Sequence, residues 1–352
     1  MSGLIDDLLA GKHRALARVI SNIEDRRPGY RELVSELHQH TGSADVIGVT
    51  GSPGSGKSTL VDKMAATYRE RGLTVGIIAI DPSSPFTGGA ILGDRIRMGS
   101  NIGDMDVFVR SMSARGSLGG LSTATTDAVK ALDAFGKDKI IIETVGAGQN
   151  EIDIVKTADT VMVLVPPGSG DDVQMLKAGI LEIGDIFVVN KADRKGANRT
   201  VQQLREMLEY NRGGIPESGG HHGAGAMEQV DGLQLEAETE TDRWRAEIVE
   251  TVAKTGEGVD DLLDVLESHA SHIERSGERE EHVRARYAEE IRTLVREDVN
   301  ELLAEELDVR GGMDAYVDAV VERKTDPYAV SDELIEPLAE CVRTQRKSRE
   351  QQ

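Results

Sequence analysis

The chain has 352 residues, of which 39% are hydrophobic but only 3% aromatic, and its formal net charge is −21. This length allows one large α/β domain with extensions, or two domains, around a core of aliphatic side chains. The acidic balance excludes the basic surface typical of nucleic-acid binding, and the single cysteine, Cys341, excludes a disulfide framework or a cysteine-based zinc site. The acidity fits either an ordinary surface or a protein that stays soluble in concentrated salt.

The sequence predicts neither a membrane segment nor secretion. Residues Met1 to Arg14 lack the apolar centre of a signal peptide. No apolar run approaches the roughly 18 residues that a membrane-spanning helix needs. We therefore expect a cytoplasmic protein without a membrane partner.

Residues 4 to 40 carry apolar side chains at three- and four-residue steps, as in Leu16, Val19 and Ile20. This spacing is typical of amphipathic helices, and glycine and proline divide the run. We predict two or three helices in an N-terminal extension, residues 1–44, that packs on the domain behind it.

Seven short apolar runs alternate with helical patterns between residues 45 and 272. Several are apolar on both faces, which is typical of a parallel sheet covered by helices. We therefore predict a doubly wound α/β domain with a mostly parallel sheet, whose ligands bind where the strands end. The runs are Val46–Thr50, Val75–Ile80, Val107–Arg110, Lys139–Ile142, Thr160–Val165, Ile186–Val189 and Ile248–Val252.

The first run leads into a complete phosphate-binding loop of the G-x-x-x-x-G-K-[ST] type. A strand, a glycine-rich loop and a helix give the context in which backbone N–H groups and a helix N-terminus hold phosphates. Lys57 is expected to reach the β- and γ-phosphates and the Ser58 hydroxyl to bind Mg²⁺. The predicted nucleotide-binding residues here are Gly51, Ser52, Pro53, Gly54, Ser55, Gly56, Lys57, Ser58 and Thr59.

Three acids are candidate ligands of Mg²⁺, which prefers few carboxylates together with water and phosphate oxygens. Asp81 ends the second run, Glu143 ends the fourth, and Asp94 lies in a glycine-rich stretch between them. The alternative for each acid is a turn or cap residue without chemistry. A glycine segment after Glu143 predicts a switch ordered by the γ-phosphate. Its Gly146 N–H would sense that phosphate, and Gln149 either orients the attacking water or is a solvated residue.

Asn190, Lys191 and Asp193 form an N-K-x-D sequence directly after the sixth run. The Asp193 carboxylate can accept both the N1–H and the exocyclic amine of guanine, whereas adenine offers no matching pair of donors. Because unpaired buried polar groups reject a wrong base strongly, this sequence predicts guanine specificity. We expect Asn190 to tie this loop to the phosphate loop and the Lys191 stem to cover the base.

A second loop against the base is expected after the last run. Backbone N–H groups of Val252, Ala253 and Lys254 would contact guanine there. The T-G-E-G sequence that follows is also compatible with a simple turn.

Two segments lie outside this pattern. Residues 211–242 gather glycines and then acids, which predicts a flexible surface insertion, and the adjacent His221 and His222 have no partner near in sequence for a metal site. Residues 273–352 are charged and carry apolar side chains at helical spacing, with a last helix expected from about Ser331. We expect this C-terminal segment to fold back on the domain or to meet a partner, and favour a homodimer arm.

Long runs outside the generic motifs resemble the MeaB/ArgK family of P-loop GTPases. They are D-P-S-S-P-F-T-G-G-A-I-L-G-D-R-I-R-M from Asp81, R-G-S-L-G-G from Arg115 and E-T-V-G-A-G-Q from Glu143, within a similarity from about Leu8 to Leu266. The resemblance implies that the lysine, the serine and the three acids above lie at nucleotide and Mg²⁺ positions, and Asp193 at the guanine position. It further implies that residues 166–177 form an extra switch toward a partner, with Lys177 a candidate catalytic residue.

Proteins of this family act as chaperones of adenosylcobalamin-dependent methylmalonyl-CoA mutase and are usually homodimers. The resemblance therefore implies a slow GTPase, using GTP and Mg²⁺ and accelerated by its partner, that gates cofactor loading into an acyl-CoA mutase and protects it. The alternatives are a kinase linked to transport, as the older ArgK naming suggested, and a GTP-dependent metallochaperone. The chain departs from the family at Val252, where serine is usual, in the 211–242 insertion, and in its loosely matching C-terminal helices.

Overall fold

A computed structural model of the chain describes residues 2–81, 103–113, 123–144, 157–168, 178–212, 244–309 and 311–350. These residues belong to two compact units, Met1–Val283 and Arg284–Gln352. The first unit contains a β-sheet with its helices, and the described residues of the second are mainly helical.

Seven parallel strands form one sheet in the first unit, in the order β3-β2-β4-β1-β5-β6-β7. Each predicted apolar run is one of these strands, because side chains that are apolar on both faces of a strand can be buried only between two helix layers. The predicted α/β fold is confirmed, with every strand pair parallel. The strands are β1 (Asp45–Gly51), β2 (Val75–Asp81), β3 (Val107–Ser113), β4 (Lys139–Thr144), β5 (Thr160–Val165), β6 (Ile186–Asn190) and β7 (Glu247–Thr251).

Strand β1 lies where the winding of the chain changes direction. After β1 the chain forms β2, β3 and β4 on one side of it, and then β5, β6 and β7 on the other. In open parallel sheets, ligands bind at such a point, outside the carboxyl ends of the strands. The phosphate-binding loop begins at Gly51, the last residue of β1, so the topology places this loop at the expected ligand position.

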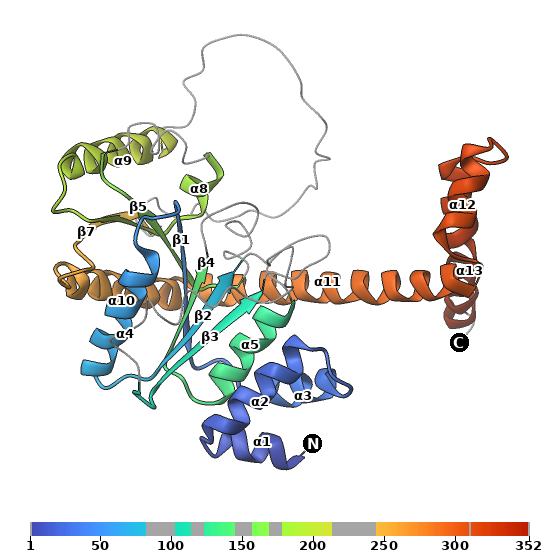
Figure 1. Cartoon of the computed structure of the whole chain (residues 1–352), viewed down its shortest axis with the longest axis horizontal. Coiled ribbons are helices and arrows are strands. Elements are labelled where there is room, and N and C mark those ends of the chain that lie inside the picture. The colour runs from blue at the N-terminus through green and yellow to red at the C-terminus, as the bar shows by residue number, and fades with distance from the viewer. Residues whose placement is uncertain are drawn as a thin grey trace, which may run out of the picture. The chain divides into compact units, whose positions relative to one another are not determined.

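Two helix layers cover the sheet (Figure 1). Along β1 the side chains alternate between them, because Val46 belongs to one buried cluster and Ile47 to the other. The cluster of Ile47 includes α4 and α10, and the cluster of Val46 includes α5, α8 and α9. These helices are α4 (Lys57–Glu70), α5 (Thr123–Ala134), α8 (Ala178–Ile183), α9 (Ala197–Arg212) and α10 (Val259–Ser276).

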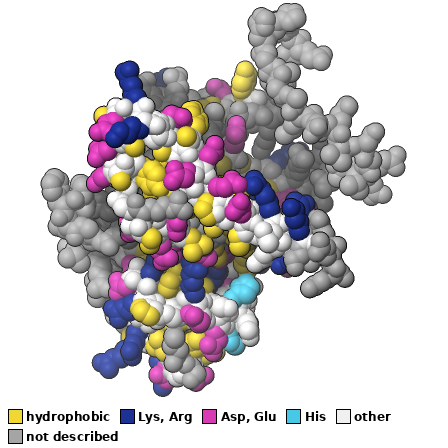
Figure 2. Space-filling view, turned by 90° about the vertical axis from the view of Figure 1, so that its right-hand side faces the viewer, with side chains coloured by type: hydrophobic (Ala, Val, Ile, Leu, Met, Phe, Trp, Pro, Cys, Tyr) yellow, Lys and Arg dark blue, Asp and Glu magenta, His cyan; other side chains and the backbone are white. Residues whose placement is uncertain are grey.

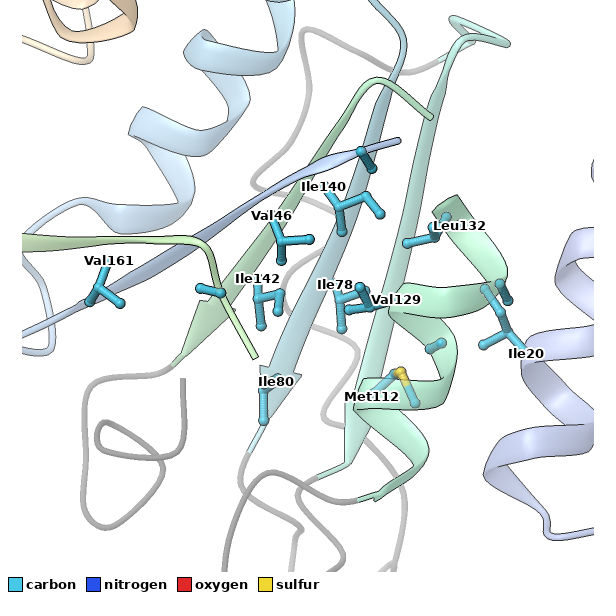
Figure 3. Close-up of a cluster of buried hydrophobic side chains, with 14 of the residues drawn as sticks. Ile20, Val46, Ile78, Ile80, Met112, Val129, Leu132, Ile140, Ile142 and Val161 are labelled. Atoms are coloured by element: carbon cyan, nitrogen blue, oxygen red, sulfur yellow. The ribbon is translucent and has the colours of Figure 1, made fainter. Parts of the chain in front are cut away.

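The N-terminal helices pack on α5 rather than directly on the strands. Figure 3 shows Ile20 of α2 on the far side of α5 from the sheet, while Leu132 of α5 and strand side chains such as Ile78 lie between α5 and the sheet. Arg110 of β3 adds a polar tie, since its Nε donates to Glu24 of α2 at 3.0 Å. The helices are α1 (Ser2–Leu9), α2 (His13–Glu24) and α3 (Tyr30–Leu37), followed by the short 3₁₀ helix η1 (His38–His40).

The C-terminal part contains α11 (Glu278–Val309), α12 (Gly312–Val321) and α13 (Pro327–Glu350). Helix α13 begins four residues before the predicted Ser331. The reason is local, because Asp326 caps the helix by accepting the N–H groups of Tyr328 at 2.9 Å and Ala329 at 3.1 Å, and proline is favoured in the first turn. None of the helices in the described ranges combines the length and apolar character that a membrane crossing requires.

Charged and apolar side chains are mixed over the face of the molecule shown in Figure 2. Acidic and basic side chains alternate there with small hydrophobic areas.

Candidate nucleotide-binding site

The phosphate-binding loop has a backbone shape that requires glycine. Gly51, Gly54 and Gly56 have φ angles of 134°, 76° and 99°, in the region that side chains disfavour. A Cβ atom on Gly51 would lie 2.2 Å from the carbonyl oxygen of Leu164 in β5. Gly56 is the N-cap of α4, so the N-terminus of this helix opens onto the loop, where it favours anions.

Two side chains of the loop are arranged to receive phosphate. The buried Lys57 donates through Nζ to the carbonyl oxygens of Gly51 at 2.7 Å and Ser52 at 3.1 Å. An ammonium group held in this way can exchange carbonyl oxygens for charged phosphate oxygens, which form stronger hydrogen bonds. The buried hydroxyl of Ser55 has no hydrogen-bond partner among the described residues. Because buried polar groups are usually paired, this hydroxyl fits a site completed by a polar ligand.

Ser58 and Glu143 bring hard oxygen donors together beside the loop. The Ser58 hydroxyl donates to Glu143 Oε1 at 2.6 Å, and Glu143 lies in β4 opposite Val49 of β1. Hydroxyl and carboxylate oxygens suit Mg²⁺, which takes its other ligands from water and phosphate. The pair therefore fits this ion. No cluster of three or more His, Cys, Asp or Glu residues suited to a metal occurs within the described ranges.

Asn190, at the end of β6, joins three loops. Its Nδ2 donates to the Ser55 carbonyl at 2.8 Å, and its Oδ1 accepts from the Ala253 N–H at 3.1 Å and the Thr251 hydroxyl at 3.2 Å. The side chain is fully enclosed, with 1% of the residue exposed. A Cβ atom on Gly56 would lie only 2.4 Å from Asn190 Nδ2. The loop after β6 and the phosphate loop are thus fixed against each other.

Lys191 and Asp193 follow in the same loop. Lys191 has a φ angle of 63°, and its Nζ donates to the Gly54 carbonyl at 2.6 Å, so its stem extends along the phosphate loop. Asp193 is exposed, and within the described part of the chain its carboxylate forms no hydrogen bond or ion pair. A carboxylate oriented by its loop but free of protein donors can accept the two N–H donors of guanine.

The loop after β7 differs in part from the expectation. The N–H of Val252 donates to Glu257 at 2.9 Å and that of Ala253 to Asn190, so neither can contact a base without exchanging its bond. Lys254 is exposed. Thr251 was missed by sequence reasoning, although it faces Asn190 directly in the β6–β7 register. Its contact with Asn190 follows from the pairing of β6 with β7, and the sequence alone does not reveal which strands are neighbours in the sheet.

Several predicted site residues lie outside the described residues. Asp81 is the last residue of β2, but the structure does not describe its side chain. The predicted residues that the described ranges leave out entirely are Asp94, Gly146, Gln149, Lys177, and most of the predicted 211–242 insertion with His221 and His222.

Two further predicted nucleotide-binding residues are described and exposed. Thr59 lies near the start of α4, and Pro53 lies in the phosphate loop.

Sequence comparisons give a consistent result. A family model described as "Methylmalonyl Co-A mutase-associated GTPase MeaB" matches residues 16–308. A protein of Pyrococcus abyssi named as a putative GTPase is 44% identical over 338 residues, which cover 95% of this chain and 96% of the relative. The mouse "Methylmalonic aciduria type A homolog, mitochondrial" is 30% identical over 289 residues, covering 78% of this chain and 64% of its own.

A solved structure with the same fold is also known. The crystal structure of an LAO/AO transport system kinase superposes with a TM-score of 0.64 at 20% identity, covering 96% of this chain and 97% of the other. At this identity the likeness concerns the fold alone.

Proposed function

Since the chain belongs to the MeaB family of methylmalonyl-CoA mutase-associated GTPases, we propose that it binds and hydrolyses GTP with Mg²⁺ and serves an acyl-CoA mutase as a chaperone. In this role it would gate the loading of adenosylcobalamin and protect the loaded enzyme. We place this function in the cytoplasm.

One observation supports the nucleotide part most strongly. The loop that carries Asp193 is fastened to the phosphate loop by two hydrogen bonds, from Asn190 to Ser55 at 2.8 Å and from Lys191 to Gly54 at 2.6 Å. A phosphate cradle and a free carboxylate are therefore held at a fixed spacing. A guanine nucleotide has the matching groups, namely phosphates at one end and paired N–H donors at the other.

Hydrolysis would depend on positioning and charge stabilisation, as in other phosphoryl-transfer reactions. Lys57 donates to the loop carbonyls and would stabilise the charge that develops on the phosphates. When bound, Mg²⁺ neutralises phosphate charge, and Ser58 and Glu143 would hold it with Asp81 and Asp94. Gly146, Gln149 and Lys177 complete the proposed set as switch residues.

The partner proposal rests on the family description, which names methylmalonyl-CoA mutase, and on the name of the mouse relative, which refers to methylmalonic aciduria. The geometry of the site favours a GTPase that a partner switches on over one that is fully active by itself. Lys57 donates to its own loop's carbonyls, an arrangement that a nucleotide must rearrange before reaction. A partner that favours the rearranged state would accelerate hydrolysis.

We also propose a homodimer formed through the C-terminal segment. Along α11, the exposed side chains of Tyr287, Ile291, Val295, Val299 and Leu302 recur at three- and four-residue steps. They form an apolar stripe along one face of the helix. Contiguous exposed apolar surface of this kind marks a protein interface.

The nucleotide proposal is tested by binding and hydrolysis of GTP and ATP. Lys57→Ala should lower GTP hydrolysis at least about 100-fold, because it removes a preorganised charge from the phosphates. Lys347→Ala, at an exposed position of α13, is the matched control and should hydrolyse GTP as the wild type does. Equal turnover of ATP and GTP would contradict the proposal, and transfer of phosphate to an acceptor other than water would favour the kinase.

Asp193→Asn tests the base assignment separately. The asparagine amide would donate to the C2 carbonyl of xanthine, which replaces the exocyclic amine of guanine. We expect the ratio of GTP to xanthosine triphosphate affinity to fall at least about 100-fold, since a site built for one hydrogen-bond pattern rejects the other strongly. An unchanged ratio would remove Asp193 from the base site.

A further inference from the structure

The loop after β5 and the loop after β6 meet backbone to backbone. Gly168, in the first loop, has a φ angle of 95°, and Gly196, in the second, has a φ angle of 99°. A Cβ atom on Gly196 would lie 3.0 Å from Gly168 Cα and 3.3 Å from Gly168 N. These distances are tighter than most Cβ contacts in proteins, so a side chain at position 196 would push the Gly168 backbone outward by a few tenths of an ångström. The positive φ angle at this position disfavours a side chain as well.

Thr200 holds both loops at this contact. Its hydroxyl accepts the N–H of Gly168 at 3.3 Å, and its own N–H donates to the carbonyl of Gly196 at 3.0 Å. Thr200 lies in the first turn of α9 and is buried, with 2% of the residue exposed. The buried hydroxyl thus binds the loop after β5, while the backbone N–H of the same residue binds the loop after β6. Loss of the hydroxyl would leave the Gly168 N–H without this acceptor, which is costly where the group is shielded from water.

The contact at Gly196 follows Asp193 closely along the same loop. Between the two residues, the N–H of Arg194 donates to Lys191 at 3.0 Å and that of Ala197 to Arg194 at 3.4 Å, so the turn is closed upon itself. The side chains of Asn190 and Lys191 fix the first half of the turn to the phosphate loop. Gly196 fixes its second half to the loop after β5. The loop segment that carries Asp193 is thus held on both sides, at Asn190 and Lys191 before it and at Gly196 after it.

We propose that Thr200, acting through the Gly168–Gly196 contact, is a positioning residue for guanine recognition by Asp193. This inference rests on the proposed function of Asp193. Two hydrogen bonds in one plane require the carboxylate to be held closely, since small displacements of a positioned group cost large factors. The loop after β5 therefore supports base selectivity although it need not touch the base.

The test compares GDP with inosine diphosphate, which lacks only the exocyclic amine, by calorimetric titration. Thr200→Val removes the hydroxyl at nearly constant volume and should lower the ratio of GDP to inosine diphosphate affinity about tenfold. Gly196→Ala should lower it similarly, and Thr200→Ser, which keeps the hydroxyl, should retain the wild-type ratio. A purely structural role would weaken both nucleotides equally and leave the ratio unchanged.

Gly72→Ala is the control. Gly72 also has a positive φ angle, 81°, but nothing lies within 4 Å of the position that a Cβ atom would take there, so the ratio should not change. Wild-type ratios in both Thr200→Val and Gly196→Ala would overturn the inference while leaving Asp193 in place. A wild-type protein that does not distinguish the two nucleotides would instead contradict the guanine assignment itself. If Thr200→Val does not fold, Gly196→Ala decides the question.

Discussion

Gly56 lies where the phosphate loop contacts the loop after β6, which carries Asn190 and Asp193. The absence of a side chain at Gly56 matters to both loops. The loop motif explains this glycine by the approach of phosphate. The structure adds a second reason, since a Cβ atom here would lie 2.4 Å from Asn190 Nδ2. One residue thus permits both the curvature of the cradle and the close contact that sets its distance from Asp193.

A second group of interacting residues lies at the amino ends of β5 and β6, at the other end of the strands from the phosphate loop. His269 of α10 is buried and its Nδ1 is 2.8 Å from the Thr160 hydroxyl, while its Nε2 is 3.6 Å from Asp185. Trp244 packs edge-on against the His269 ring at 4.7 Å between centroids and donates to the Asp185 carbonyl at 3.0 Å. Sequence reasoning missed this group, because its members are far apart in the chain and match no motif.

The environment of His269 predicts a pH dependence of stability. Burial lowers the pKa of His269 to about 4, with His272 and His282 adding to the effect and Asp159 opposing it. Below pH 6.5 the unfolded chain therefore binds a proton that the folded protein does not, and folding loses stability as the pH falls toward 4. Burial acts on Asp185 in the opposite sense and raises its pKa to about 7, although a third of this side chain is exposed.

His269→Asn isolates the histidine, because Asp185 remains in both proteins. Relative to the variant, the wild type should lose about 2 kcal/mol of unfolding free energy between pH 7.5 and pH 5, at about 1.4 kcal/mol per unit of pKa shift. Denaturant titration followed by fluorescence of Trp244, the only tryptophan, would measure it. A constant difference between the two proteins over this range would show that His269 titrates normally in the fold.

At the scale of elements, the strands were predictable and their ends less so. The apolar runs identify all seven strands, but β4 continues past the predicted Ile142 to Thr144. The reason is that backbone pairing ignores side-chain polarity, and Glu143 pairs with Ala79 of β2 as regularly as the isoleucines do. Polar residues that extend apolar strands in this way are the ones that reach the ligand edge.

The limits of prediction within the site follow the same logic. The glycine loop and the N-K-x-D sequence are local signals, so the sequence alone places Lys57 and Asp193 on the correct elements. Contacts such as the one between Thr200 and Gly168 join segments that are far apart in the sequence, and no pattern in the sequence predicts them. Their discovery requires the order of the strands.

Helix α2 provides a stability test for the N-terminal extension. Ile20 is completely buried against α5 (Figure 3), so Ile20→Ala should lower the unfolding free energy by about 2–5 kcal/mol through lost contacts and a residual cavity. Arg18→Ala, at an exposed position of the same helix, should change it by less than about 0.5 kcal/mol. Equal effects of the two substitutions in denaturant titrations would mean that α2 does not contribute to the core.

At the scale of the whole molecule, the second compact unit makes the proposed dimer testable. Val295→Glu places a charge in the exposed stripe of α11, and Asn300→Glu adds the same charge at an exposed position outside the stripe. Burying an unpaired charge is unfavourable, so the first substitution should weaken self-association at least about tenfold and the second should not. Light scattering coupled to size-exclusion chromatography measures both. A monomeric wild type would contradict the proposed dimer.

Regulation by an adenosylcobalamin-dependent acyl-CoA mutase is the property that defines the proposed function of this GTPase. Steady-state GTP hydrolysis, measured with and without purified methylmalonyl-CoA mutase and with Lys57→Ala as the inactive reference, tests it most directly. We predict a mutase-dependent rise of at least about tenfold, in the range that a partner's contribution to phosphoryl transfer allows, together with a complex whose stability depends on the nucleotide. An unchanged hydrolysis rate and no complex with the mutase in any nucleotide state would contradict the chaperone function.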